Sequence, residues 1–177
     1  MCGLIIFVPG CSRQVPSYPP PAQIVLPSGP EPPLFLDPSR GRLIAMSDPD
    51  VDSHILSGVF AADPGAEWRF TGPTAQFRFD VPQTADLTFY MRFYNPADAF
   101  RARGPMSFSV IVNGNRIASP RYTGSGDQEF RRPIPAGWIL KPGPVDVSIE
   151  IDPPWHASDG MTYGVMLNSI GFEIAKP

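Results

Sequence analysis

The segment Met106–Ala118 constrains the fold of this chain more than any other. Phe108, Val110 and Val112 alternate with small or less apolar residues, so they lie on one face of a strand. The Asn113-Gly114 pair that follows tolerates positive φ at both positions, which predicts a two-residue turn and a return strand. A hairpin with one apolar face needs a second sheet to cover it. The segment therefore predicts a protein with two layers of β-strands.

Other segments repeat this alternation and predict about eight to ten short strands in all. We expect residues 76–81 and 86–94 to form an antiparallel pair through the loop between them. The 24 prolines oppose helices and central strands, so almost no helix is expected. The fold predicted is all-β: a two-sheet antiparallel β-sandwich of the jelly-roll type, with an immunoglobulin-type sandwich as the alternative. The expected inward residues in its clearest strands are Phe77, Phe79, Val81, Leu87, Phe89, Met91, Phe93, Phe108, Val110, Val112, Val145, Val147, Ile149 and Ile151.

Proline also divides the chain, because ten of the 24 prolines lie in the first 38 residues. We expect a signal ending at 1–11, a proline-rich tether at 12–38 and a β-sandwich domain at 39–177. Such a tether favours extended polyproline II, at ~3 Å per residue. Its two apolar patches, Ile24–Leu26 and Leu34–Leu36, can dock on the domain itself or on a partner.

The N-terminus carries a short apolar run followed by Val8, Pro9, Gly10 and Cys11. This arrangement resembles the end of a bacterial lipoprotein signal peptide. The resemblance implies cleavage before Cys11, lipidation of its thiol, and a protein that is anchored in the cell envelope or secreted. A basic leader is missing and the run is short, so an uncleaved apolar arm is the alternative. Both cysteines lie in the first eleven residues, which excludes a disulfide framework in the domain.

Charge argues against one class of partner. The net charge is −3, whereas a general nucleic-acid binder shows a basic face or stripe. Two short arginine groups, Arg101 with Arg103 and Arg131 with Arg132, are interpreted as solvated charges of loops and edges.

The acidic stretch at residues 47–52 raises the question of a metal. Asp48, Asp50 and Asp52 alternate and can present carboxylates to a structural calcium ion. However, Ser53 and Val59 stand where an EF-hand loop needs glycine and glutamate. A polar turn is therefore expected, and no cofactor or metal site is predicted.

Catalytic motifs are absent from the sequence. The two histidines, His54 and His156, form no zinc-hydrolase pattern, and no Gly-x-Ser-x-Gly or phosphate-binding glycine loop occurs. Asp146 and Glu150 share a strand face at ~13 Å, which is too far for the carboxylate pair of a glycosidase. The chain is therefore not expected to be an enzyme.

The best candidate binding residues lie in the loop at 153–160. An exposed Trp155 can stack on the apolar face of a sugar, and His156 and Asp159 can bond its hydroxyl groups. The prolines at 153 and 154 would hold the tryptophan in place and lower the ordering cost of binding. The alternative is that Trp155 folds back and caps the sandwich.

A second candidate is the outward row Tyr90, Arg92 and Tyr94 on one strand. Exposed aromatic and arginine side chains suit either a glycan or a protein interface. Trp68 and Trp138 lie in or beside strands, where a core or rim position is expected.

Three segments together resemble a known class of domain: Ser57–Phe60 leading to Glu67–Thr71, then Phe108–Ile117, then Gly164–Phe172. They resemble the carbohydrate-binding-module-like jelly rolls of bacterial envelope proteins over roughly residues 50 to 175. The resemblance implies a non-catalytic recognition module whose ligand is a glycan. The alternative is a structural or assembly subunit that docks on an envelope protein through its N-terminal arm. The oligomeric state is left open.

Overall fold

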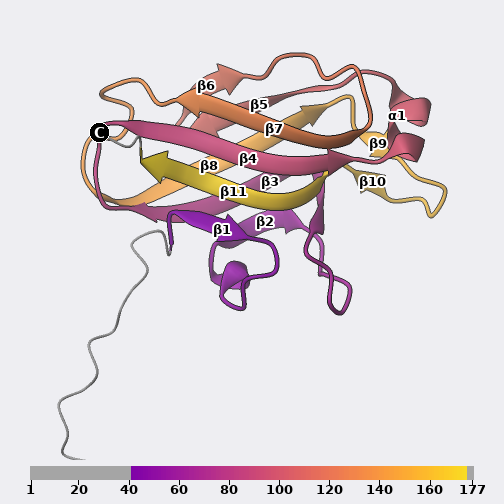
Figure 1. Cartoon of the computed structure of the whole chain (residues 1–177), viewed down its shortest axis with the longest axis horizontal. Helices are drawn as coiled ribbons and strands as arrows, with labels where there is room; N and C mark the ends of the chain where they lie inside the picture. Colours follow the sequence, from indigo (N-terminus) through magenta and orange to yellow (C-terminus); the bar gives the residue numbers. More distant parts are fainter. Residues whose placement is uncertain (1–40, 175–177) are drawn as a thin grey trace, which may run out of the picture. The chain divides into compact units, whose positions relative to one another are not determined.

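Antiparallel strands make up most of the computed structural model, which describes residues 41–174 (Figure 1). The predicted signal ending and tether, with Cys11 and both apolar patches, lie outside the described residues. The all-β jelly-roll-type sandwich is confirmed. The strands are β1 Leu43–Ala45, β2 Ile55–Val59, β3 Arg69–Val81, β4 Leu87–Asn95, β5 Ser107–Val112, β6 Asn115–Ala118, β7 Gly126–Pro133, β8 Gly143–Asp152, β9 Trp155–His156, β10 Thr162–Tyr163 and β11 Met166–Ile174.

Two layers share the long strand β3. One layer, sheet A, contains β1, β11, β4 and β7; the other, sheet B, contains β2, β3, β8, β5 and β6. The first residues of β3, Arg69 and Phe70, pair with β11, while residues 74–81 pair with β8. Strand β3 therefore begins beside sheet A and continues as a central strand of sheet B.

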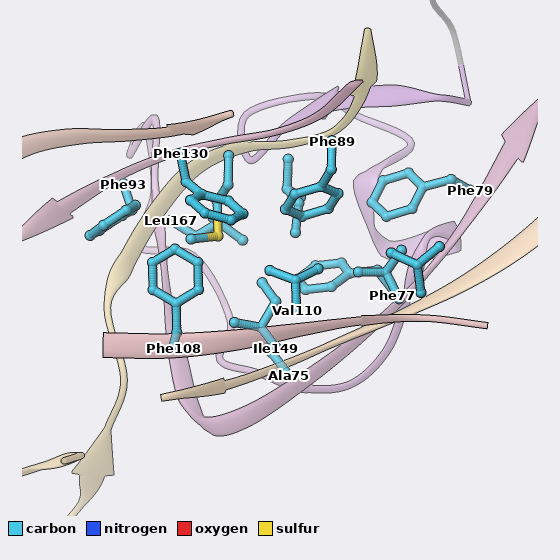
Figure 2. Close-up of a cluster of buried hydrophobic side chains, with 14 of the residues drawn as sticks. Ala75, Phe77, Phe79, Phe89, Phe93, Phe108, Val110, Phe130, Ile149 and Leu167 are labelled. Carbon is cyan, nitrogen blue, oxygen red and sulfur yellow. The ribbon is translucent and has the colours of Figure 1, made fainter. Parts of the chain in front are cut away.

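The core fills the space between the two sheets, as Figure 2 shows. Side chains of β4, β7 and β11 meet side chains of β3, β5 and β8 there. Every inward residue predicted from alternation is at most 5% exposed. Burial of apolar surface stabilises a fold by roughly 25 cal/mol per Å², so this interface is the main source of stability.

The hairpin predicted within Met106–Ala118 is confirmed as β5 and β6. Val112 pairs with Asn115 across the turn. Asn113 and Gly114 both have positive φ, at 46° and 84°, which is the backbone that the Asn-Gly pair favours.

The expected pairing of residues 76–81 with 86–94 is wrong. Strand β3 pairs with β2, β8 and β11, whereas β4 pairs with β11 and β7. The loop at 82–86 instead carries the chain from sheet B to sheet A, and it ends at Asp86 with φ 55°. Residues 75–81 of β3 and 87–93 of β4 each have an apolar face, and each strand buries that face against the other sheet across the core.

Almost no helix was expected, and a short one, α1 (Ala97–Arg103), follows β4. It follows Pro96 and ends before Gly104, whose φ of 75° suits glycine. At seven residues it is too short for periodicity to reveal. A 3₁₀ turn, η1, spans Val51–Ser53. No helix among residues 41–174 has the length and apolarity needed to cross a bilayer.

Candidate functional site

At one end of the sandwich, α1 lies beside the small hairpin of β9 and β10 (Figure 1). The hairpin follows β8, and its register pairs Trp155 with Tyr163 and His156 with Thr162. The helix follows β4. Two segments that are far apart in the sequence thus meet over the same end of the fold.

Five aromatic side chains gather there, and we call them the end cluster: Phe60, Trp68, Phe70, Trp155 and Tyr163. The Tyr163 ring is central, with its centroid 4.6 Å from Phe70, 5.1 Å from Phe60 and 5.6 Å from Trp155. Trp68 extends the cluster through an edge contact with Phe70 at 5.2 Å. All five side chains are half-buried, so the cluster packs rings together while leaving part of each exposed.

Beside Trp155 lies a hollow, which we call the end groove. Its cavity volume is about 250 Å³, and its lining consists of Ala102, Arg103, Pro153, Pro154, Trp155 and His156. Trp155 is therefore both a member of the end cluster and a residue that borders an open space.

Hydrogen bonds within the hairpin hold its polar side chains. Asp159 accepts the Met161 backbone N–H through Oδ1 and the Tyr163 hydroxyl through Oδ2, both at 2.8 Å. The hydrogen bond to Asp159 is the main cause that raises the pKa of Tyr163 above its ordinary value. The exposed His156 has Nδ1 3.0 Å from the Thr162 hydroxyl oxygen. Asp159 thus supports the central ring of the end cluster.

Arg103 corrects the expectation of a solvated charge. Its guanidinium donates to the Gly164 carbonyl at 2.7 Å, to Asn95 Oδ1 at 2.8 Å and to the Pro153 carbonyl at 3.4 Å. Burial lowers the pKa of Arg103 to about 10. The side chain therefore ties α1 to β4, to the turn after β8 and to the residue after β10, and it forms one wall of the end groove.

The three loop residues predicted from sequence lie on one hairpin. Trp155 packs against Phe70 and Tyr163, which is the capping position considered as the alternative, and it also borders the end groove. His156 lines the groove. Asp159 is not among the lining residues of the groove; its carboxylate accepts the hydroxyl of Tyr163, a member of the end cluster.

The predicted row on β4 lies on the outer face of sheet A, where Arg92 and Tyr94 are exposed and Tyr90 is buried. Tyr90 is only 8% exposed, since the Arg131 guanidinium lies 4.5 Å above its ring. The Arg92 guanidinium faces the Asp127 carboxylate at 3.6 Å. Tyr94 is 37% exposed. The row is therefore an ion-paired surface, and Tyr90 does not present the exposed aromatic face that was expected.

Strand pairing nevertheless places Tyr94 on the same sheet face as Phe70, a member of the end cluster. Met166 of β11 pairs with Tyr94 on one side and with Phe70 on the other. Directly opposed residues project to the same face of a sheet, so this face leads from Tyr94 to a member of the end cluster.

The aspartates of the acidic stretch take part in local bonds. Asp48 Oδ2 accepts the Ala45 backbone N–H at 2.8 Å, and Asp52 forms an ion pair with Arg69. Within residues 41–174, no group of three or more His, Cys, Asp or Glu side chains is arranged to hold a metal ion.

Sequence reasoning missed Arg103, Phe60 and Tyr163 as members of this site. The alternation of Trp68 with Phe70 was visible, but it did not indicate which end of the sandwich the rings would reach. Nothing local to Arg103 distinguishes it from the exposed Arg101 two residues earlier. Its role depends on contacts with residues 50 and 61 positions away.

No protein-family model matches the sequence, and no curated protein matches it. Solved structures do match. A family 35 carbohydrate binding module from an environmental isolate is 16% identical with a TM-score of 0.44, over 76% of this chain and 98% of the module. The xylan-binding module CBM15 is 15% identical with a TM-score of 0.45, over 80% and 95%.

A larger protein also matches. The exo-β-1,3-galactanase of Phanerochaete chrysosporium is 13% identical with a TM-score of 0.40, and the match spans 75% of this chain but 29% of the galactanase. Two of these three proteins are carbohydrate-binding modules, the class of jelly roll that the sequence resembles. At these identities and TM-scores the likeness carries no argument about ligands, which must come from the residues of this chain.

Proposed function

We propose that this chain is a non-catalytic module that recognises a glycan in the end groove, with Trp155 as the platform on which a sugar ring stacks. The observation that carries the proposal is the dual position of Trp155, which borders the groove and is held from behind by Phe70 and Tyr163. A half-buried aromatic ring of this kind offers an apolar face without a large change in its own conformation.

Rigidity of the platform supports this proposal. Two prolines precede Trp155, and the Ala157 N–H bonds the Met161 carbonyl at 3.0 Å to close the hairpin. A preformed site loses less conformational entropy when a ligand binds. The groove volume of about 250 Å³ is near the lower end of ligand sites, which suits a small part of a glycan.

The chemistry of the groove favours binding over catalysis. None of the six described residues that line it is a carboxylate. Glycoside hydrolysis ordinarily requires two carboxyl groups that flank the scissile bond. The nearby carboxylate of Asp159 is engaged by Tyr163 and by the backbone of Met161. The groove thus has an apolar platform and hydrogen-bond donors without a catalytic pair.

A glycan-array screen of the full chain, with and without calcium, tests the proposal. We expect a reproducible hit that is lost in Trp155→Ala and retained in Trp138→Ala. Trp138 is a matched control because it is half-buried against the core near the β5–β6 turn, about 20 Å along β8 from the end groove by strand rise. A blank array from folded protein, or equal binding by both variants, would contradict the proposal.

We also propose, from the residues around Cys11, that the chain acts at a bacterial cell envelope to which a lipid on that cysteine anchors it. Expression of the full chain and of Cys11→Ser in a bacterium tests this point. The parent should fractionate with membranes and the variant should be released. A variant that stays with the membranes would show that Cys11 carries no anchor.

A further inference from the structure

Arg103 differs from its neighbour Arg101 in how its charge is balanced. The exposed Arg101 forms an ion pair with Asp98 one turn earlier in α1. Arg103 bonds only neutral oxygens among residues 41–174: two backbone carbonyls and the side-chain oxygen of Asn95. Its Nε is buried and has no hydrogen-bond partner in that part of the chain. The structure therefore holds a partly buried cation without a carboxylate beside it.

A partly buried guanidinium that has no carboxylate partner attracts an anionic group of a ligand. Neutral oxygens stabilise a guanidinium less than a carboxylate does, because a carboxylate adds the attraction between opposite charges to the hydrogen bond. Burial already disfavours the charged form of Arg103 and lowers its pKa to about 10. At neutral pH the side chain nevertheless stays protonated, so its positive charge persists in the wall of the groove.

The position of this charge links it to the ligand. Arg103 lines the same hollow as Trp155 and His156. Attraction between charges is stronger beside a protein wall than in open solvent, because the wall has a lower effective dielectric constant. The only charged or titratable side chains among the described residues of the lining are Arg103 and His156, and neither repels an anion.

We propose that the glycan bound in the end groove carries an acidic sugar, whose anionic group lies toward Arg103 while its ring stacks on Trp155. This inference rests on the proposed function and specifies its ligand class. Acidic sugars carry either a carboxylate, as in uronic acids, or a sulfate, and the chemistry they share is a negative charge attached to a ring.

The test compares ligands that differ only in charge. The full chain is titrated, at low and at high sodium chloride, with oligosaccharides of glucuronic or galacturonic acid. Their methyl esters, the corresponding neutral glucose and galactose oligomers, and sulfated forms of the latter are titrated alongside. We expect at least one acidic ligand to bind about tenfold more tightly than its ester and its neutral counterpart. That preference should shrink at high salt, because salt screens charge.

Substitutions test whether Arg103 causes the preference for acidic ligands. Arg103→Met should abolish the preference for acidic ligands, Arg103→Lys should keep part of it, and Arg101→Gln should leave it intact. Because Arg103 also bonds Pro153 and Gly164 on either side of the hairpin, the fold of Arg103→Met is checked by circular dichroism before its binding is compared with that of the parent chain. If that variant does not fold, the comparison of acid with ester in the parent chain decides the question without it.

Different results would overturn the proposed glycan-binding function and the acidic-sugar inference. Equal binding of acidic and neutral ligands, still lost in Trp155→Ala, would overturn the acidic-sugar inference and leave the proposed function in place. An acidic preference that persists in folded Arg103→Met would also overturn it. Absence of any Trp155-dependent binding to either ligand set would overturn the proposed function itself.

Discussion

The core and the end cluster use the same aromatic residue types in opposite ways. In the core, Phe77, Phe89 and Phe172 are fully buried between the two sheets. In the end cluster, the rings come mainly from short strands and strand ends, and each remains partly exposed. Enclosure on all sides gives stability. Support from one side gives a surface that is rigid and still open to a ligand.

The largest difference should appear when one ring is removed from each region. Phe77→Ala should lower the free energy of unfolding by about 3–5 kcal/mol, because it leaves a cavity in a dry core. Phe70→Ala should cost only about 1–2 kcal/mol, because a half-buried ring loses less apolar contact. Urea denaturation of both variants measures the two losses. Equal losses would show that the end cluster is simply part of the core.

Gly164 tests how closely the end cluster is held to the sandwich. A Cβ at this position would lie 2.4 Å from Thr71 Oγ1 and 2.5 Å from the Gly72 carbonyl oxygen. Gly164→Ala should therefore displace the residue between Tyr163 and β11, whose carbonyl accepts the Arg103 bond. We expect a loss of about 1–3 kcal/mol in unfolding free energy together with weakened glycan binding.

Gly114→Ala is the matched control for Gly164→Ala. Gly114 has no atom near its added Cβ, but its φ is 84°, so the substitution strains the β5–β6 turn and does not touch the end groove. It should destabilise the chain and leave glycan binding intact. A Gly164→Ala variant that binds glycan as well as the parent would show that the groove tolerates movement of the segment between β10 and β11.

The smallest expected effect concerns the pH dependence of Tyr163. Its pKa is raised above 10, chiefly by the hydrogen bond to Asp159. The bond therefore stabilises the folded chain at pH values below the ordinary tyrosine pKa, and this contribution is lost as the pH rises through the raised pKa of the folded state. Asp159→Asn should bring the Tyr163 titration back toward the ordinary value.

Ultraviolet absorbance of the phenolate follows that titration. Tyr122 serves as an internal control, because burial raises its pKa to about 12 independently of Asp159. A titration curve that is identical in the parent and in Asp159→Asn would show that the bond does not persist in solution.

Sequence alone predicted the core well, because alternation is a local signal. The inward residues of β5 and β8 follow from period-two spacing, and the Asn113-Gly114 turn from backbone preference. The true partners of β3 and β4 were not predictable in this way, and the expected pairing of the two strands with each other is wrong. A five-residue loop can close a hairpin or cross between sheets, and alternation is the same in both cases.

The candidate site was predicted only in part for a related reason. Trp155 was identifiable because two prolines frame it in a polar loop. Arg103 and Tyr163 acquire their positions through long-range contacts with Gly164, Phe70 and Phe60, which no local pattern encodes. Tyr90 is covered by Arg131 from the neighbouring strand, and that coverage depends on strand order.

The most direct test of the account is the fluorescence of Trp155 itself. In a full chain with Trp68→Phe and Trp138→Phe, Trp155 is the only tryptophan among the three of the sequence, and its emission reports on the end groove. Titration with the glycans that the parent chain binds on the array should shift this emission saturably, since a stacked sugar displaces water from the indole. Saturable glycan binding with unchanged Trp155 emission would place the ligand elsewhere and contradict the account.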